Sequence, residues 1–324
     1  MRWARGFRLA VAALVLSVLA SQAAACSTGT GTSTRTRHES QVQTPAPAVI
    51  PAGSGRLSWI LTKAALNALI ADSHVRAQLS GAQIFEILTG TERPATALAV
   101  VPTMSFKSFA TLEDTLNRGT LRPDIRAVIY DAEHWAQTPT DEQRDPATFY
   151  QRAAQLAHAH GLIFIATPAM DLVNADGGKA ADPATAFVDR RIGADAAPSA
   201  DVVDIQAQSL ERDAAAYRSF VARVSAQIRA VNPKVTVLAG LSTNPHGSAI
   251  TPDMLVAAML GAAGQVTGFW MNVPGKGSDC PKCNAPQPDV AVAALSDGRM
   301  ARLADIFAPS DAASGLSATS TTSS

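Results

Sequence analysis

The sequence predicts an α/β fold, specifically a (β/α)8 barrel of the TIM type. Residues 56–309 alternate short apolar, β-branched runs with longer segments of helical periodicity, which is typical of a parallel sheet covered by helices. This core of about 250 residues has the usual length of a single barrel. The main alternative is a doubly wound open sheet, but no G-x-G-x-x-G or P-loop follows any expected strand.

Seven strands are expected from the apolar runs. They cover residues 83–88, 96–104, 127–135, 162–170, 201–208, 234–243 and 265–273. Nearly continuous apolar runs such as 162–166 fit strands that are buried on both faces. An eighth strand is not evident after residue 273, and the apolar segment RLSWIL at 56–61 is the one candidate for it. If that segment is not a strand, the barrel is irregular or incompletely closed.

The segments between the strands carry helix start and stop signals. The segment 145–161 begins with Asp145 as an N-cap and Pro146 at the first helical position, and it ends in glycine. The segment 251–264 repeats this scheme with Thr-Pro at its start and glycine at its end. These signals support helices on the outside of a parallel sheet.

Both ends of the chain are expected to lie outside the barrel. Residues 1–25 combine early arginines, an apolar run and small residues, which is the pattern of an export signal. Cys26 follows at once, and this arrangement resembles a bacterial lipoprotein signal with a lipidated cysteine, although an alanine stands where leucine is usual. Residues 26–55 predict a flexible Ser/Thr/Pro tether and 310–324 a disordered tail. The expected location is the outer face of the cell membrane, with simple secretion as the alternative.

The other two cysteines, Cys280 and Cys283, lie in the motif CPKC within a Gly/Pro-rich loop. A zinc site would need two further ligands at suitable spacing, and none lies near in sequence. A thioredoxin-like motif would stand at a helix start after a strand. Because an exported chain meets an oxidising environment, we expect a local disulfide between these two residues.

The charge balance excludes some classes of partner. The chain has 27 Lys and Arg against 27 Asp and Glu, and it has no basic cluster, so nucleic acid is not an expected partner. His158 and His160 are two residues apart on a helix and point to different faces, so no metal site is expected there. No cofactor motif is present. The expected partners are a neutral small ligand and the membrane, through a lipid on Cys26.

In such a barrel, functional residues gather at the carboxyl ends of the strands. Nearly every expected strand turns polar or aromatic at that end, often at alternate positions. The candidate ligand-binding residues there are Trp135, Gln206, Gln208, Asn244, Trp270 and Asn272. Amides hydrogen-bond hydroxyl groups, and indole faces cover the apolar face of a sugar ring. This end of the barrel therefore suggests a carbohydrate ligand, while core or rim packing stays open for the two tryptophans.

Asp131 and Glu133 are the candidate catalytic residues. Two residues apart on one strand face, their Cα atoms would be about 7 Å apart. Close carboxylates raise one pKa, which keeps one group protonated as an acid. The segment resembles the Asp-x-x-Asp-x-Asp-x-Glu motif of the chitinase-like family 18 glycosidases, although Arg126 and Ile129 stand where that motif has its first two aspartates. The resemblance implies that Glu133 is the general acid and that Asp131 orients the substrate.

The core also resembles a group of uncharacterised bacterial lipoproteins. The segments that carry this resemblance are YDAEHWAQTP, DIQAQ, WMNVP and CPKC. It covers most of the core and implies no activity. The sequence thus favours an exported, surface-anchored, glycosidase-like hydrolase with Glu133 as general acid. The strand that ends in Trp270 and Asn272 carries no second carboxylate, so a carbohydrate-binding lipoprotein without catalysis, or a scaffold for a protein partner, remains an alternative.

Overall fold

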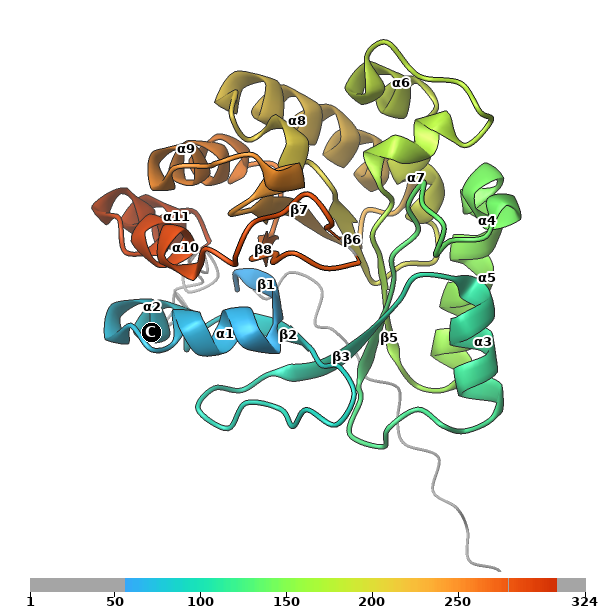
Figure 1. Cartoon of the computed structure of the whole chain (residues 1–324), viewed down its shortest axis with the longest axis horizontal. Coiled ribbons are helices and arrows are strands. Elements are labelled where there is room, and N and C mark those ends of the chain that lie inside the picture. Colours follow the sequence, from blue (N-terminus) through green and yellow to red (C-terminus); the bar gives the residue numbers. More distant parts are fainter. Residues whose placement is uncertain (1–55, 279, 308–324) are drawn as a thin grey trace, which may run out of the picture. The chain divides into compact units, whose positions relative to one another are not determined.

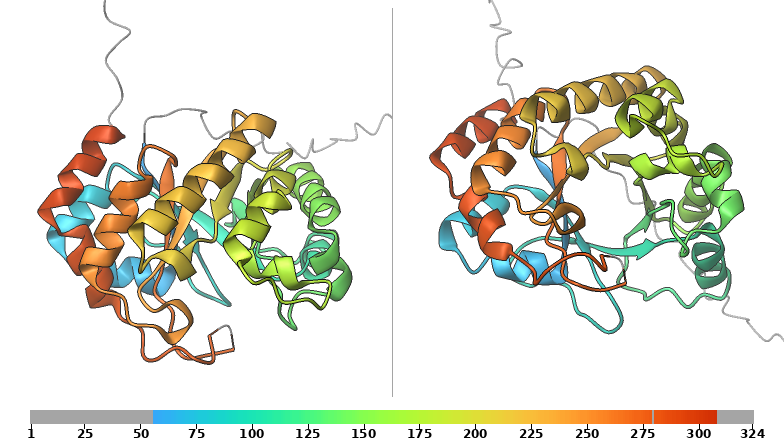
Figure 2. Two further views of the ribbon diagram at one scale, coloured as in Figure 1. Left: turned by 90° about the horizontal axis from the view of Figure 1, so that it is seen from above. Right: turned by 45° about the horizontal axis from the view of Figure 1, so that its top comes forward.

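The structure, a computed structural model, describes residues 56–278 and 280–307. These residues form a closed barrel of eight parallel strands with helices around it (Figures 1 and 2). The (β/α)8 prediction is therefore confirmed. The predicted export signal, Cys26, the tether and the tail at 310–324 lie outside the described residues.

The eight strands follow each other around the barrel in chain order. They are β1 (Ser58–Thr62), β2 (Gln83–Ile87), β3 (Val101–Phe106), β4 (Ala127–Tyr130), β5 (Ile163–Ala166), β6 (Val202–Ile205), β7 (Thr236–Ser242) and β8 (Gly268–Asn272). All of the pairs are parallel, so the carboxyl ends of the eight strands meet at one end of the barrel.

The missing eighth strand is the first in the chain. The segment RLSWIL supplies β1, which pairs with β2 through Ser58 and Gln83 and with β8 through Ser58 and Gly268. Gly268 is needed at this joint, because a Cβ there would lie 1.9 Å from the Ser58 carbonyl oxygen. The candidate for the eighth strand is thus confirmed, and it closes the barrel although it precedes the other strands in sequence.

Most of the predicted strands are longer than those observed, and the differences are largest at β3 and β4. The strand expected at 96–104 covers Val101–Phe106 instead, and the Ala95 backbone N–H bonds the Glu86 carboxylate at 2.8 Å rather than a sheet partner. The strand expected at 127–135 ends at Tyr130. Beyond it the chain leaves the ladder and turns, so Glu133 and Trp135 lie in a loop rather than on a strand face.

Eleven α-helices are described. They are α1 (Lys63–Leu69), α2 (Ser73–Leu79), α3 (Phe109–Asn117), α4 (Thr140–Arg144), α5 (Pro146–Ala159), α6 (Pro183–Asp189), α7 (Ile192–Ala196), α8 (Ala214–Val231), α9 (Pro252–Ala262), α10 (Pro288–Leu295) and α11 (Ala301–Ile306). Short 3-10 helices η1 (Met170–Asn174), η2 (Gln208–Leu210), η3 (Pro245–Gly247) and η4 (Gly298–Met300) accompany them. None of the described helices is long and apolar enough to cross a membrane.

The predicted helix starts are confirmed. The Asp145 carboxylate accepts from the backbone N–H of Thr148, and the Thr251 hydroxyl oxygen accepts from that of Met254. In both helices proline occupies the first turn, where its missing N–H removes no hydrogen bond. α5 ends before Gly161, whose φ of 69° lies in the left-handed region that glycine adopts freely.

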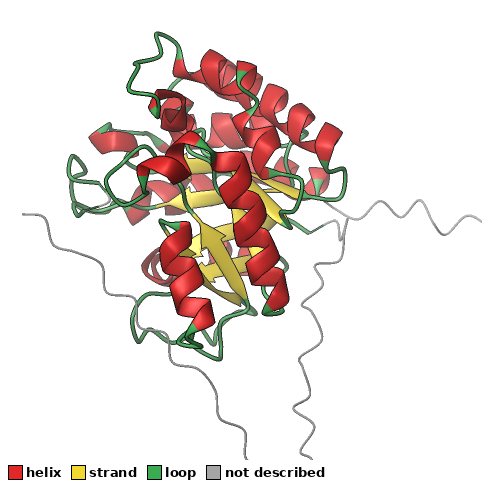
Figure 3. Ribbon diagram, turned by 90° about the vertical axis from the view of Figure 1, so that its right-hand side faces the viewer, coloured by secondary structure: helices red, strands yellow, loops and turns green. Residues whose placement is uncertain are grey.

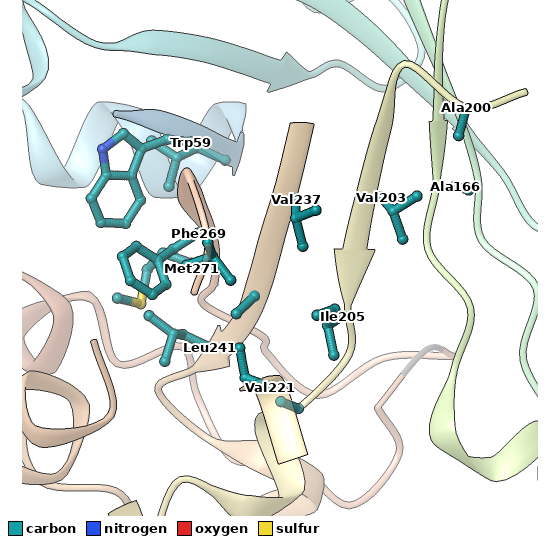
Figure 4. Packing of buried hydrophobic residues seen from close by; sticks show 14 of the residues in the cluster. Trp59, Ala166, Ala200, Val203, Ile205, Val221, Val237, Leu241, Phe269 and Met271 are labelled. Carbon is teal, nitrogen blue, oxygen red and sulfur yellow. The ribbon is translucent and has the colours of Figure 1, made fainter. Parts of the chain in front are cut away.

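The core has two parts. An inner cluster fills the barrel with side chains such as Ile60, Phe85 and Ile165. The helices surround the strands (Figure 3), and a larger outer cluster of side chains lies between the two layers. Figure 4 shows the section of this cluster around β6, β7 and β8. Trp59 and Phe269 pack there with ring centroids 5.7 Å apart. Successive side chains alternate between the two clusters, as a doubly covered strand requires.

Candidate active site at the carboxyl ends of the strands

Asp131 is the first residue after β4 and is 7 % exposed. Its backbone N–H still bonds the Phe106 carbonyl of β3 at 2.8 Å. Its Oδ1 accepts hydrogen bonds from the Thr167 hydroxyl at 2.7 Å and from the Gln206 amide at 3.0 Å. Residues that follow β4, β5 and β6 therefore converge on one carboxylate.

Glu133 lies close to Asp131 and is partly buried. Burial, then the charges of Asp131 and Asp171, raise the pKa of its carboxyl to about 9, while Lys107 and a hydrogen bond with Gln206 oppose the rise. The carboxyl therefore carries its proton at neutral pH. A protonated carboxyl beside a second carboxyl is the arrangement expected of a general acid.

Trp135 is half-buried beside this pair. Its Nε1 donates to the Thr138 hydroxyl at 2.8 Å, and the Lys107 ammonium lies 4.5 Å from the centre of its ring. One face of the indole is thus already engaged by a cation. A sugar ring stacking on Trp135 would need the other face.

His134 is exposed, and its Nδ1 lies 2.6 Å from the Gln143 side-chain oxygen of α4. Its backbone N–H donates to Asp171 at 2.9 Å. This bond ties Asp171, which follows β5, to the loop of Glu133, so a third carboxylate belongs to the site although nothing in the sequence spacing indicated it.

Gln206 and Gln208 follow β6. Gln206 donates to the Thr167 carbonyl at 2.9 Å as well as to Asp131, so it links the ends of β4, β5 and β6. The Gln208 amide lies over Gly240, where an added Cβ would be 2.8 Å from its atoms. Gly240 pairs in register with Trp270 of β8, and the missing side chain on β7 makes room for the Gln208 amide.

Asn244 lies in the loop after β7, and Trp270 and Asn272 lie on β8. Asn272 pairs with Ser242 and is partly exposed. Asn244 is fully buried, and neither its amide nitrogen nor its amide oxygen has a hydrogen-bond partner within the described residues. The indole N–H of Trp270 is likewise buried without one. Buried polar groups without a partner in the protein need one, which an ordered water or a ligand that reaches them would supply.

The loop after β8 contains a disulfide and packs against the loop after β7, which carries Asn244. Cys280 and Cys283 form the predicted disulfide, with the sulfurs 2.01 Å apart. The Cys283 sulfur lies 3.3 Å from the Asn244 carbonyl oxygen. Gly247, with a φ of 84°, lies so close to this loop that a Cβ would be 2.2 Å from the Lys282 carbonyl oxygen. The CPKC motif therefore holds the loop after β8 against the loop after β7.

Sequence reasoning missed two buried carboxyl groups near these residues. Asp204 on β6 and Glu211 after η2 are both 0 % exposed, and burial raises the pKa of each well above its ordinary value. The signal for Asp204 was present, since it is the one charged residue inside the apolar run VVDI. The backbone N–H of Ser242 donates to Glu211, which joins it to the end of β7.

No group of three or more His, Cys, Asp or Glu side chains in residues 56–278 and 280–307 is arranged to hold a metal ion. A cavity of about 410 Å³ lies at the opposite, amino end of β2 and β3, lined mainly by apolar residues such as Ile84 and Val101 together with Arg56. It contains none of the predicted site residues.

No family model and no curated protein matches the sequence. Among solved structures, the chain is similar to the carboxyl transferase domain of pyruvate carboxylase from Rhizobium etli, at 10% identity and a TM-score of 0.44, covering 79% of this chain and 47% of that chain. It thus spans about half the length of that protein. A candidate alpha-L-fucosidase from Bacteroides thetaiotaomicron gives 10% identity and a TM-score of 0.44, over 82% of this chain and 98% of that chain.

A family GH18 chitinase catalytic domain from the fern Peteris ryukyuensis gives 18% identity and a TM-score of 0.35, over 65% of this chain and 73% of that chain. Two of these three neighbours are thus described as a chitinase and a fucosidase. At these identities and TM-scores the likenesses carry no argument about what this chain does. The functional argument depends on the site.

Proposed function

We propose that this protein is an exported, glycosidase-like hydrolase that acts on a glycan, with Glu133 as its general acid. The observation that carries the proposal is the position of the partly buried Glu133 carboxyl beside Asp131 at the carboxyl end of a (β/α)8 barrel, where burial and the neighbouring carboxylates raise its pKa. Cleavage of a glycosidic bond needs such a proton donor, because the leaving oxygen must be protonated as its bond to the sugar carbon breaks.

Asp131 acts as the partner of Glu133 in this proposal. Thr167 and Gln206 fix its Oδ1 by hydrogen bonds of 2.7 Å and 3.0 Å, so its orientation is set before substrate arrives. From there it can orient a polar group of the sugar or stabilise the positive charge that develops on the ring. A preorganised carboxylate of this kind needs no reorganisation during the reaction.

The substrate would lie along the ends of β6, β7 and β8. Gln206, Gln208 and Asn272 are partly exposed there, and the amide of Asn244 and the indole N–H of Trp270 are unpaired. None of these groups carries a charge, which suits the hydroxyl and amide groups of a neutral glycan. Export through residues 1–25 and lipidation of Cys26 would bring the barrel to glycans at the cell surface.

A non-catalytic glycan binder is the second candidate. It is favoured by β8, which ends in Trp270 and Asn272 and so offers amide and indole groups where many glycosidases have a carboxylate. The same residues would then bind a glycan that is never cleaved.

The test is to incubate the purified chain with a panel of bacterial and plant glycans, N-acetylated ones included, and to follow the products by mass spectrometry. Glu133→Gln should abolish cleavage and leave the fold intact. The control is Glu113→Gln, which changes an exposed carboxylate on α3 that pairs with Arg152 at 3.5 Å. Cleavage that survives in Glu133→Gln excludes this residue as the acid. Thermal stabilisation by a glycan without any cleavage identifies a binder instead.

A further inference from the structure

Asp204 is a buried acid for which the chemistry of the site has so far given no role. It lies on β6, is 0 % exposed, and neither carboxyl oxygen has a hydrogen-bond partner within the described residues. Its neighbours Val203 and Ile205 belong to the outer cluster and Val202 to the inner one, so the Asp204 side chain points into the barrel. An unpaired carboxyl in an apolar barrel is costly and stays protonated.

The strand register brings Asp204 into one row with Thr167 and Asp131. Tyr130 pairs with Ala166, and Ala166 pairs with Val203. Tyr130, Ala166 and Val203 are followed in the sequence by Asp131, Thr167 and Asp204, respectively. The Thr167 backbone N–H still bonds the Tyr130 carbonyl at 3.3 Å, so the pairing continues for this row. Neighbouring strands are about 4.8 Å apart, which leaves Thr167 between the two carboxyl groups.

The Thr167 hydroxyl has one hydrogen and two acceptors within reach. Its oxygen lies 2.7 Å from Asp131 Oδ1 and 3.4 Å from the Tyr130 carbonyl oxygen. Thr167 is fully buried, so water outside the protein cannot orient it. A donor that approached the hydroxyl oxygen from the side of Asp204 would occupy its lone pair and direct its hydrogen to Asp131.

We propose that Asp204 is a positioning residue of the Glu133 site, whose carboxyl O–H donates through one buried water to the Thr167 hydroxyl and so directs that hydroxyl to Asp131. The chain of donors runs from β6 through β5 to β4. It stabilises the ionised form of Asp131, which is the form that keeps the proton on Glu133. The catalytic consequence rests on the proposed function, but the hydrogen-bond chain does not.

Several ionisable groups act on this row from the surrounding elements, and each must stay unchanged in a test. They are Lys107 after β3, Asp131 and Glu133 after β4, Tyr150 on α5, Asp171 after β5, and Glu211 and Tyr217 between β6 and the first turns of α8. None of the substitutions below alters any of them.

The experiment is a ¹³C NMR titration of the side-chain carboxyl groups of Asp131 and Glu133 in the full chain. Asp204→Leu and Thr167→Val each remove one link of the donor chain. Because Asp131 then loses stabilisation as an anion, the lower of the two apparent pKa values of the Asp131–Glu133 pair should rise by about one unit. The higher pKa value, called the higher step below as the lower one is called the lower step, should stay unchanged. Asp204→Asn keeps a donor at the same place and should leave both steps unchanged.

The double variant Asp204→Leu with Thr167→Val decides whether the two residues act in series. If Asp204 acts through Thr167, the double variant should shift the lower step no further than Thr167→Val alone. Equal and additive shifts would overturn the proposal, as would a lower step that does not move in Asp204→Leu. The titration needs no turnover, so a protein that cleaves no glycan but shows these shifts rejects the proposed function and keeps this inference.

Stability supplies the control for folding. Burial raises the pKa of Asp204 in the folded chain, so this carboxyl costs least stability below the ordinary carboxyl pKa, and its cost grows as the pH rises. Asp204→Leu should therefore stabilise the protein, and more at pH 7 than at pH 4, as measured by urea unfolding. If neither Asp204→Leu nor Asp204→Val folds, the carboxyl holds the barrel together rather than orienting Thr167, and the proposal fails.

Discussion

The side-chain amide of Gln206 lies 3.0 Å from Asp131 Oδ1 and 2.9 Å from the Thr167 carbonyl oxygen, and it thereby joins the ends of three strands. β5 and β6 share only two register pairs, Ile165 with Val202 and Ala166 with Val203. The amide therefore supplies cross-links where the backbone ladder is short. This bridge is a structural element of the site as well as a candidate ligand contact.

Gln206→Leu should lower the free energy of unfolding by about 1–3 kcal/mol, because it leaves a buried carboxylate oxygen and a carbonyl short of a donor. Gln208→Leu is the matched control, since Gln208 is two residues further on and also partly buried. It should cost clearly less. Urea unfolding of the two variants makes the comparison, and equal losses would mean that the Gln206 bridge contributes no particular stability.

The pKa of about 9 at Glu133 predicts the alkaline limb of activity. The general acid works only when protonated, so kcat/KM should hold through neutral pH and fall above about pH 9. Lys107 lowers this pKa by its positive charge. Lys107→Met should therefore move the limb to higher pH, by about half a unit to one unit.

The control for this prediction is Lys234→Met. Lys234 is exposed and precedes β7, so it lies at the amino end of the barrel, away from Glu133. Its removal should leave the alkaline limb in place. An alkaline limb that moves equally in both variants would show a general effect of net charge instead of a local one, and a limb well below pH 9 in the unchanged protein would contradict the assignment of Glu133.

Alanine substitutions at two glycines on adjacent strands, β7 and β8, should have different effects. A Cβ on Gly240 would meet the Gln208 amide at 2.8 Å, which is the end of a flexible side chain, whereas a Cβ on Gly268 would meet the Ser58 backbone at 1.9 Å. Gly240→Ala should therefore displace Gln208 and weaken glycan binding with a stability loss of only about 1 kcal/mol. Gly268→Ala should open the joint between β1 and β8 and cost several times more.

Thermal unfolding and glycan titration separate these effects. If Gly240→Ala binds glycan as well as the unchanged protein does, Gln208 has no part in recognition. If Gly268→Ala is as stable as Gly240→Ala, the close approach of β8 to β1 is not what fixes the register at closure.

The barrel was predictable because its strands and helices are marked by local patterns. The run 162–166 is apolar at every position, and the N-caps Asp145 and Thr251 mark the starts of α5 and α9. β1 was harder to assign because it follows directly on the long polar segment that precedes the barrel. Strand closure between the first and last strands is a long-range relationship that no local pattern records.

The site was predictable only in part, for the same reason. Asp131 and Glu133 were found because they follow an apolar run directly, and Gln206 because it follows another. Their contacts depend on the register between strands, which also brought Asp171 to the loop of Glu133 by a bond to the His134 backbone. The extension of strand alternation through Trp135 failed, because β4 leaves the sheet after Tyr130.

The disulfide gives the last prediction. Cys280 and Cys283 are three residues apart, so their bond closes a very short loop and should contribute only about 2 kcal/mol through chain entropy. Replacing both with serine should leave the barrel folded and lower its melting temperature by about 5 °C. Because the Cys283 sulfur contacts the Asn244 carbonyl, the larger effect should be on the loop after β7.

Glycan affinity should therefore fall in the double serine variant by more than the modest stability loss explains. Reducing the unchanged protein with a thiol should reproduce both effects, and Asn244→Ala should weaken binding without changing the melting temperature response to the reductant. An affinity that is insensitive both to the double serine change and to reduction would mean that Asn244 does not contact the ligand, or that the loop after β8 does not hold it in position.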